Sequence, residues 1–190
     1  MIAPKEIKSL IIEAFTDDVH PAYGQIATVN QEGRARVRTV HLHYIKQVDA
    51  IVFNTHIQSR KWEELSDNPY VSGCYFDLFR SIQFRFEAKV QLIAPKNHEH
   101  TSLLDLLWLK MREEVRRAYW LDSLNKSIRD SLPKNISLHQ RAPNLGSMIC
   151  MPYQWHIYET PAEDFTKGKA TLYTQKNGRW QTQKVDLLHY

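Results

Sequence analysis

RARVRTVHLHYIKQVDAIVFNTHIQSRK, residues 34–61, is the stretch that decides the fold. It alternates apolar and polar residues as two strands do, over 34–46 and 50–55, and it runs directly into a helix that begins after Ser59. A reversal near Gln47–Asp49 would pair the two strands antiparallel and place Arg38 opposite roughly position 58. The stretch therefore predicts a β-hairpin that ends at the start of a helix.

Cationic and hydroxyl side chains gather at that helix start. Ser59 is a preferred N-cap residue, and Arg60 and Lys61 follow it. The first turn of a helix has unpaired N–H groups and the positive end of the helix dipole, which favour an anion. Together with Arg38, these residues predict a phosphate site. A solvated basic hairpin edge beside an ordinary N-cap is the alternative that the residues alone leave open.

Further elements are expected on both sides of this stretch. The 3.6-residue periodicity of apolar positions predicts helices, and runs of β-branched and aromatic residues predict strands. The expected helices lie at 4–15, 59–66 and 98–121, and the further strands at 23–30, 70–77, 82–93, 147–151, 155–159, 170–175 and 180–185, with one more short helix within the polar stretch 122–143. This order predicts one mainly β domain over residues 1–190, with peripheral helices around a small antiparallel barrel.

Composition excludes several classes of protein. The 190 residues carry a net charge of +4, which permits an anionic ligand or nucleic acid but requires neither. Glu113 and Glu114 interrupt the basic run 110–117, and the aromatic residues alternate as core residues do, so we expect no nucleic-acid partner. No apolar run approaches the length of a membrane span, so we expect no membrane partner.

The cysteines and glycines exclude further kinds of site. Cys74 and Cys150 are far apart in the sequence, which argues against a disulfide framework or structural zinc and favours a reducing cytoplasm. The six glycines form neither of the glycine-rich motifs that cradle nucleotide phosphates in Rossmann and P-loop proteins.

Metal binding and nucleophilic catalysis have little support. His41 and His43 share one face of a strand, but no third ligand at a suitable spacing accompanies them, so we expect no metal. No Ser-His-Asp or Cys-His spacing singles out a nucleophile. Such a chain suits a protein whose cofactor performs the chemistry.

Four segments, in one order, resemble the pyridoxamine 5′-phosphate oxidase family of FMN-binding split barrels. They are RTVHLH at 38–43, VFNTHIQSRKWEEL at 52–65, NPYV at 68–71 and QFRFEAKV at 83–90. The resemblance implies an FMN-binding split β-barrel, a homodimer with the flavin at the subunit interface, and a small-molecule substrate. It also implies roles for particular residues: Arg38, Ser59, Arg60 and Lys61 would hold the FMN phosphate, the backbone of Thr39, Val40, Asn54 and Thr55 would line the flavin, and Gln83 would bond near its ring.

The chain departs from the family's pattern at the substrate. His43 stands where the family has a substrate-clamping lysine, and Thr166–Ala170 stand where oxidases have an Arg-x-His-x-Arg arm, which leaves only Lys167 and Lys169 there. The segment around Trp108 and Tyr119 is similar to a shorter-armed oxidase-like subfamily of cyanobacteria and plants. By the same resemblance, Arg116 is a candidate contact for a substrate anion, together with His43.

The sequence thus predicts an FMN-dependent oxidoreductase that passes hydride between a small substrate and FMN, without the vitamin B6 substrate arm. Two alternatives stay open. One is a true pyridoxamine or pyridoxine 5′-phosphate oxidase, and the other is a flavin-binding module without catalysis.

Overall fold

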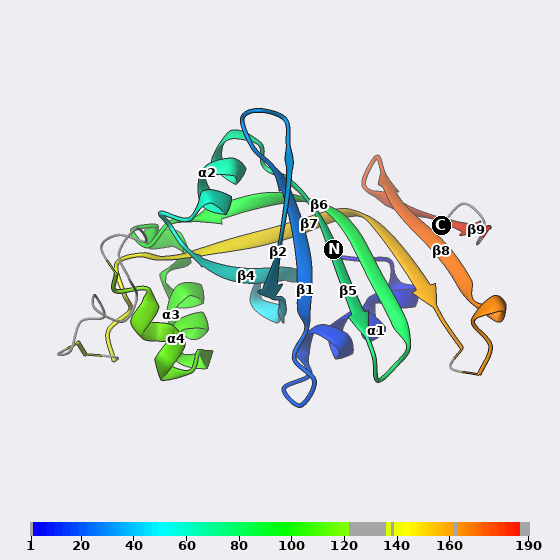
Figure 1. Cartoon of the computed structure of the whole chain (residues 1–190), viewed down its shortest axis with the longest axis horizontal. Helices are drawn as coiled ribbons and strands as arrows, with labels where there is room; N and C mark the ends of the chain where they lie inside the picture. The colour runs from blue at the N-terminus through cyan, green and yellow to red at the C-terminus, as the bar shows by residue number, and fades with distance from the viewer. Residues whose placement is uncertain (1, 122–135, 138, 162, 187–190) are drawn as a thin grey trace.

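The computed structural model describes residues 2–121, 136–137, 139–161 and 163–186 (Figure 1). Its α-helices are α1 (Lys5–Thr16), α2 (Arg60–Asp67), α3 (Thr101–Lys110) and α4 (Glu113–Ala118). Its strands are β1 (Tyr23–Val29), β2 (Ala35–His41), β3 (His43–Ile45), β4 (Ala50–His56), β5 (Tyr70–Asp77), β6 (Ile82–Ile93), β7 (Leu145–Glu159), β8 (Lys169–Lys176) and β9 (Arg179–Val185). Short 3-10 turns occur at Lys46–Val48, His98–His100 and Phe165–Lys167.

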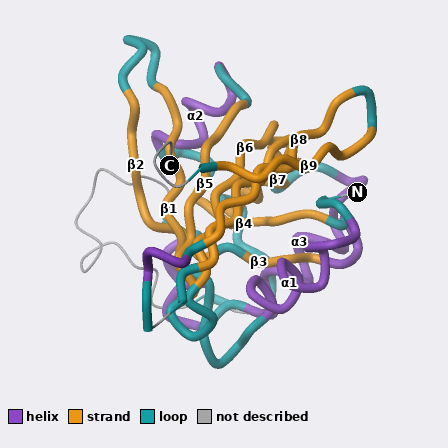
Figure 2. Tube along the Cα trace, turned by 90° about the vertical axis from the view of Figure 1, so that its right-hand side faces the viewer, coloured by secondary structure: helices purple, strands orange, loops and turns teal. Residues whose placement is uncertain are grey.

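The described strands form one antiparallel sheet in the order β2-β1-β5-β6-β7-β4-β3, with β8 and β9 added beside β7. The sheet does not close, because β2 and β3 stand at opposite ends of that order. The long strand β7 serves both parts: its first half pairs with β4, and its second half pairs with β8. Figure 2 shows α1 and α3 on one side of the sheet and α2 on the other, beside the β1–β2 hairpin.

The predicted hairpin is present, but its first strand is divided. β3 pairs with β4 across a turn that ends at Asp49, which has a left-handed backbone conformation with φ of 45°. The preceding residues instead form β2, which pairs with β1 and places Arg38 opposite Ile26. The expectation that Arg38 lies opposite position 58 is therefore wrong. The division falls at the fully buried Leu42, whose N–H donates to the carbonyl of Ala22.

Two further boundaries differ from the prediction. The single helix expected at 98–121 is two helices, α3 and α4, separated at Met111 and Arg112. The two strands expected at 147–151 and 155–159 are one strand, β7. Pro152 does not end that strand, because the register with β6 shifts beside it and a bulge accommodates a residue without an N–H. The short helix expected within 122–143 falls largely outside the described residues.

A group of aromatic rings lies in the core between α1 and the sheet. The Phe15 ring packs against Tyr75, Phe84 and Trp155, with ring centroids 5.5, 5.6 and 6.2 Å away. The indole N–H of Trp155 donates to the carbonyl of Ile2 over 2.9 Å, so this buried polar group is satisfied. α1 is thereby fixed to β5, β6 and β7.

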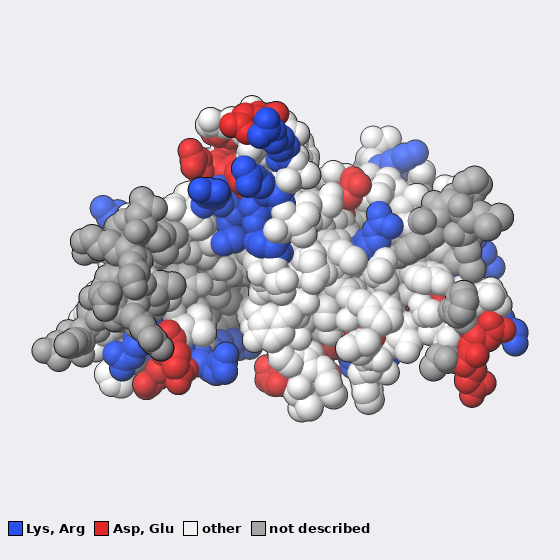
Figure 3. Space-filling model, viewed as in Figure 1, with Lys and Arg blue, Asp and Glu red and all other residues white. Residues whose placement is uncertain are grey.

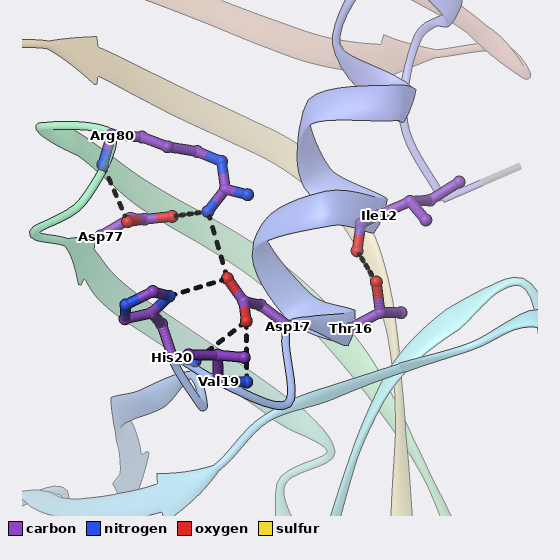
Figure 4. A network of polar contacts seen from close by, with 7 residues as sticks. All are labelled: Ile12, Thr16, Asp17, Val19, His20, Asp77 and Arg80. Carbon is purple, nitrogen blue, oxygen red and sulfur yellow. Dashed lines mark hydrogen bonds and ion pairs between the residues drawn. The ribbon is translucent and has the colours of Figure 1, made fainter.

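A polar network ties the end of α1 to the β5–β6 turn (Figure 4). The buried Asp77 and the C-cap residue Asp17 both pair with the Arg80 guanidinium, at 2.7 and 3.8 Å. Asp17 also accepts from the backbone N–H groups of Val19 and His20, each over 2.9 Å. The bond from the His20 N–H is the main reason that the pKa of Asp17 lies below its ordinary value. The network fixes the loop between α1 and β1, which forms part of the cavity described below.

No helix within the described part of the chain combines the length and the apolar character that crossing a membrane requires.

Candidate functional site

A cavity of about 730 Å³ opens between β2, β4, α2 and the α3–α4 pair. Seven residues that the sequence assigned to a cofactor or substrate line it: Thr39, Val40, His43, Asn54, Thr55, Ser59 and Lys61. The remaining candidates, Arg38, Arg60, Gln83 and Arg116, are not among its described lining residues. Figure 3 shows Lys and Arg gathered beneath the tip of the β1–β2 hairpin, with a second charged group of both signs near α4.

Three side chains form a connected polar group at the α2 end of the cavity. The Lys61 ammonium donates to the Thr55 hydroxyl over 2.9 Å, and the Thr55 and Ser59 hydroxyls lie 2.9 Å apart. Ser59 is the N-cap residue of α2, in extended conformation, but its hydroxyl is directed to Thr55 and makes no capping bond. The Trp62 N–H donates to the Ser59 carbonyl over 2.9 Å, and no side chain of a described residue caps the start of α2, an end of the helix that favours an anion. We call Thr55, Ser59 and Lys61 the anchor.

Burial affects the charge of Lys61. Desolvation lowers its pKa, the nearby Arg38 lowers it further, and Glu64 opposes both effects. A partly desolvated ammonium interacts more strongly with an anion than an exposed one does, because the effective dielectric constant is lower. The anchor is therefore a place where a phosphate would be bound by charge and by hydrogen bonds together.

Arg38 lies behind the anchor, in an ion pair. Its Nη2 donates to Oε2 of Glu64 over 2.5 Å, and its Nη1 donates to the Thr28 hydroxyl and, over 3.0 Å, to the Arg36 carbonyl. Thr28 in turn donates to the same Glu64 oxygen. The structure thus brings Arg38 close to Lys61, although by a pairing of β2 with β1 that the sequence analysis did not expect.

Arg60 faces another part of the surface. It lines a smaller groove of about 300 Å³ between α2 and the β1–β2 hairpin, together with Arg36, Glu63, Glu64 and Asp67. Arg60 and Lys61 are neighbours in the sequence, but successive residues of a helix are directed about 100° apart. Only Lys61 lines the larger cavity.

The other end of the cavity has a wall of stacked rings. Tyr23 stacks on His41 at 4.8 Å between centroids, and His41 contacts His43 at 3.8 Å. Burial is the main cause that lowers the pKa of His41, and it lowers the pKa of His43 to about 4, with further contributions from His41 and Lys110. Both imidazoles are therefore neutral at pH 7. A neutral ring at position 43 binds by stacking or hydrogen bonding, not as a cation.

Lys110 and Arg112, where α3 gives way to α4, face the two histidines across the cavity. Neither residue was expected to line a site, because 110–117 was taken as a charged run within one continuous helix, 98–121, where only Arg116 was a candidate contact. The sequence shows the charge of this segment but not where it lies, because its place at the cavity depends on the break between α3 and α4.

Arg116 makes contacts at the end of α3, and its expected contact with a substrate anion stays a prediction. Its Nε donates to the Met111 carbonyl over 2.9 Å, its Nη2 donates to the Leu109 carbonyl over 2.7 Å, and its guanidinium lies over the Trp108 ring. These carbonyls lie at and just beyond the end of α3, where helices lack partners for their C=O groups. Arg116 thus terminates α3 and sets the turn that presents Lys110 and Arg112.

Gln83 is on β6, opposite Phe76 of β5 and Tyr158 of β7. It is thus on a different part of the sheet from the anchor. Among the described residues, no group of three or more His, Cys, Asp or Glu side chains is arranged to hold a metal ion.

Comparison with known proteins bears on this geometry. A family model described as pyridoxamine 5′-phosphate oxidase matches residues 11–132. Pyridoxine/pyridoxamine 5′-phosphate oxidase 2 of Arabidopsis thaliana is 34% identical over 104 residues, which make up 54% of this chain and 52% of the relative. The chain therefore matches only about half the length of that relative.

Solved structures share the fold. A pyridoxamine 5′-phosphate oxidase-related, FMN binding protein of Nostoc punctiforme superposes with a TM-score of 0.81 over 96% of each chain, at 18% identity. PhzG of Burkholderia lata, solved with tetrahydrophenazine-1-carboxylic acid, superposes with a TM-score of 0.70 over 88% of this chain and 83% of its own, at 17% identity. The predicted fold class, a mainly β split barrel with peripheral helices, is confirmed.

Proposed function

This chain belongs to the pyridoxamine 5′-phosphate oxidase family, and from that premise we propose that it is an FMN-dependent oxidoreductase acting on a small substrate. FMN would supply a ring that exchanges hydride with the substrate. The chain's own residues would bind the cofactor, orient the substrate and exclude water.

The observation that carries the proposal is the anchor at one end of a cavity of suitable size. About 730 Å³ lies within the range of small-molecule sites, roughly 300–1,000 Å³. Lys61, Thr55 and Ser59 offer one charge and two hydroxyls beside the start of α2, a donor set that suits a phosphate monoester. We propose that these residues and Arg38 hold the FMN phosphate, with Arg60 contributing from outside the cavity.

The flavin ring would extend from the anchor along β2 and β4. Thr39, Val40 and Asn54 line this part of the cavity. Asn54 Oδ1 accepts from the buried Ser147 hydroxyl over 2.6 Å, which leaves the amide N–H₂ as the part of that side chain available to a ligand. We propose that Asn54 donates to the ring.

The substrate would occupy the end bounded by the stacked rings. His41 and His43 supply neutral aromatic faces, and Lys110 and Arg112 supply positive charge opposite them. Lys167, at the position of the missing vitamin B6 arm, pairs with Asp164 at 3.4 Å. We therefore propose a substrate other than pyridoxamine 5′-phosphate. The Arabidopsis relative favours the alternative, a true vitamin B6 phosphate oxidase.

We further propose a homodimer that forms in the cytoplasm. Gln83 is distant along the sheet from the anchor of its own chain, so a partner copy would be needed for it to reach the flavin of that anchor. Phe76, its neighbour across the strands, is 42% exposed and Tyr23 at the cavity is 52% exposed. A two-fold contact would cover such residues. Mass measurement in solution tests this, and a monomer with full flavin content would exclude it.

Flavin analysis of the purified protein tests the central proposal. We expect a yellow protein that releases FMN in near one-to-one amount, whose absorbance bleaches when an electron donor is mixed with it without oxygen. Pyridoxamine 5′-phosphate and NAD(P)H are the first donors to compare. Reduction by pyridoxamine 5′-phosphate would favour the true oxidase, whereas FMN that no donor reduces would favour a non-catalytic flavin-binding module. A colourless protein that does not take up added FMN would refute the proposal.

A further inference from the structure

Glu64 is a buried carboxylate that lies close enough to the anchor to affect the charge of Lys61. It lies on α2 one turn after Lys61, and only 7% of it is exposed. Burying a carboxylate is unfavourable unless charge and hydrogen bonds compensate it. Its presence beside a site for an anion therefore needs a reason, because a negative charge there would by itself repel a phosphate.

The contacts of Glu64 form a closed triangle with Arg38 and Thr28. The guanidinium donates to Glu64 Oε2 and to the Thr28 hydroxyl, and that hydroxyl donates to the same Oε2. A bond to the Arg36 carbonyl adds a third acceptor for Arg38. Three of the five N–H donors that a guanidinium carries are thus engaged, and its plane is fixed against β1. Without Glu64, the Arg38 guanidinium would lose its charged partner in the triangle.

Charge balance gives Glu64 a second effect. Burial is the main cause that lowers the pKa of Lys61, the nearby Arg38 lowers it further, and Glu64 opposes both effects. The charged groups around Lys61 are Arg38 from β2 and Glu64 from its own helix, with Arg36 of β2 acting on Glu64. The neighbours from β1 and β4, Thr28 and Thr55, are neutral hydroxyls.

We infer that Glu64 is a positioning residue of the anchor: it fixes Arg38 beside Lys61, balances the two positive charges, and so sets how strongly the cavity prefers FMN to riboflavin. The inference rests on the proposed function, because it assumes that the anchor holds the FMN phosphate. Riboflavin lacks the phosphate, so the ratio of the two dissociation constants isolates the anchor from the rest of the cavity.

The test compares FMN and riboflavin binding, by quenching of flavin fluorescence, in the wild type, Glu64→Ala and Glu64→Gln. Glu64→Ala releases Arg38, so we expect the preference for FMN to fall about tenfold, as for loss of one charge-assisted contact. Glu64→Gln keeps an oxygen for Arg38 and Thr28 but removes the charge. At pH 7 we expect its preference for FMN to be near that of the wild type. As the pH rises, the preference should fall when Lys61 loses its proton. This fall should begin at a lower pH in Glu64→Gln than in the wild type, because the variant lacks the negative charge that favours protonated Lys61.

Glu63→Gln is the matched control, because it removes the same charge one residue earlier on α2. Glu63 lines the smaller groove, as Glu64 does, but it is outside the triangle of Glu64, Arg38 and Thr28. We expect it to leave the preference and its pH profile unchanged. Equal loss of FMN and riboflavin in Glu64→Ala would show that Glu64 only stabilises the fold, and tighter FMN binding would show that it competes with the phosphate; either result overturns the inference. If Glu64→Ala does not fold, the pH profile of the isosteric Glu64→Gln decides, and an unshifted profile overturns it. Wild type that binds neither flavin would instead refute the proposed function itself.

Discussion

The two ends of the cavity differ in how they are assembled. The anchor end comes from β4 and the start of α2, so Thr55, Ser59 and Lys61 lie within seven consecutive residues and bond to one another. The opposite end draws on the loop before β1, on β2 and β3, and on the α3–α4 turn, so His43 and Arg112 meet from distant parts of the chain. The anchor end is determined by local sequence, which suits the binding of an invariant cofactor group. The opposite end is determined by tertiary structure, so it can vary with the substrate.

Replacing Lys61 tests the anchor end most strongly. Lys61→Ala removes the one charged member of the anchor, so FMN should bind roughly ten- to a hundredfold more weakly, as expected for about 1.5–3 kcal/mol from a hydrogen bond to a charged group. Riboflavin should lose little. Titration of both flavins measures this.

Arg60→Ala is the informative companion to Lys61→Ala. Arg60 lines the smaller groove and not the cavity, so its loss should weaken FMN binding less than the loss of Lys61 does. If FMN affinity fell equally in the two variants, Arg60 would contribute to phosphate binding as much as Lys61, as the sequence predicts. If Lys61→Ala lowered the affinities for FMN and riboflavin equally, Lys61 would not contact the phosphate, and the assignment of the anchor would be wrong.

His43 provides a test of the other end through pH. Its pKa in the folded protein is about 4, below the ordinary 6.5 that the unfolded chain has, mainly because the ring is buried. The unfolded chain therefore takes up the proton first, so stability is complete above about pH 6.5 and declines as the pH falls towards about 4. At about 1.36 kcal/mol per pKa unit, the loss from this residue is at most roughly 3 kcal/mol.

Urea unfolding of the wild type and His43→Gln at several pH values measures that loss. The variant lacks the titrating ring, so its free energy of unfolding should decline less than that of the wild type between pH 6.5 and pH 4.5. His41 is retained in both proteins and contributes in the same direction. If the free energies of unfolding of the two proteins changed with pH in parallel, the pKa of His43 would not be lowered by folding, and the proposal that His43 is a neutral ring at the substrate end would be contradicted.

The contrast between a locally formed anchor end and an opposite end formed by tertiary structure explains which predictions from the sequence succeeded. Ser59 and Lys61 could be placed from the sequence because N-cap preference and helix geometry act over a few residues. Arg38 was assigned correctly to the neighbourhood of Lys61 but through a wrong register, because nothing local indicates that Leu42 crosses from one strand pair to the next. Period-two patterning specifies a face of a sheet but not the partner strand.

The α3–α4 turn could not be derived from the sequence for a related reason. An uninterrupted apolar stripe predicts one helix, but α3 ends before Met111, where Arg116 donates to the Leu109 and Met111 carbonyls. The Arg116 guanidinium also lies over the ring of the buried Trp108, a contact that apolar periodicity does not indicate. Lys110 and Arg112 were therefore missed as cavity residues even though their charges were evident.

Gly146 tests how closely the anchor depends on packing beneath it. It pairs with Thr55 across β4 and β7, and a Cβ there would lie 2.3 Å from the Trp62 ring and 2.9 Å from Ile57. Gly146→Ala should therefore displace α2 and destabilise the protein by about 1–3 kcal/mol, with weaker binding of both flavins. Thermal unfolding and flavin titration measure the two effects. Trp62→Leu in the same chain should restore part of the stability, and failure to do so would place the strain elsewhere.

The smallest expected effect concerns Arg116, which distinguishes a structural from a substrate role at the opposite end. Because its guanidinium bonds to the Leu109 and Met111 carbonyls, Arg116→Ala should lower the free energy of unfolding by about 1 kcal/mol, the usual value of a helix-terminating contact. FMN affinity should not change, since the anchor lies at the far end. Arg112→Ala, four residues earlier in the chain, removes a side chain that lines the cavity, so it should instead raise the KM for an anionic substrate and leave stability nearly intact. A rise in KM for Arg116→Ala larger than that for Arg112→Ala, at unchanged stability, would reverse the assignment and bring Arg116 into the substrate site that the sequence first suggested.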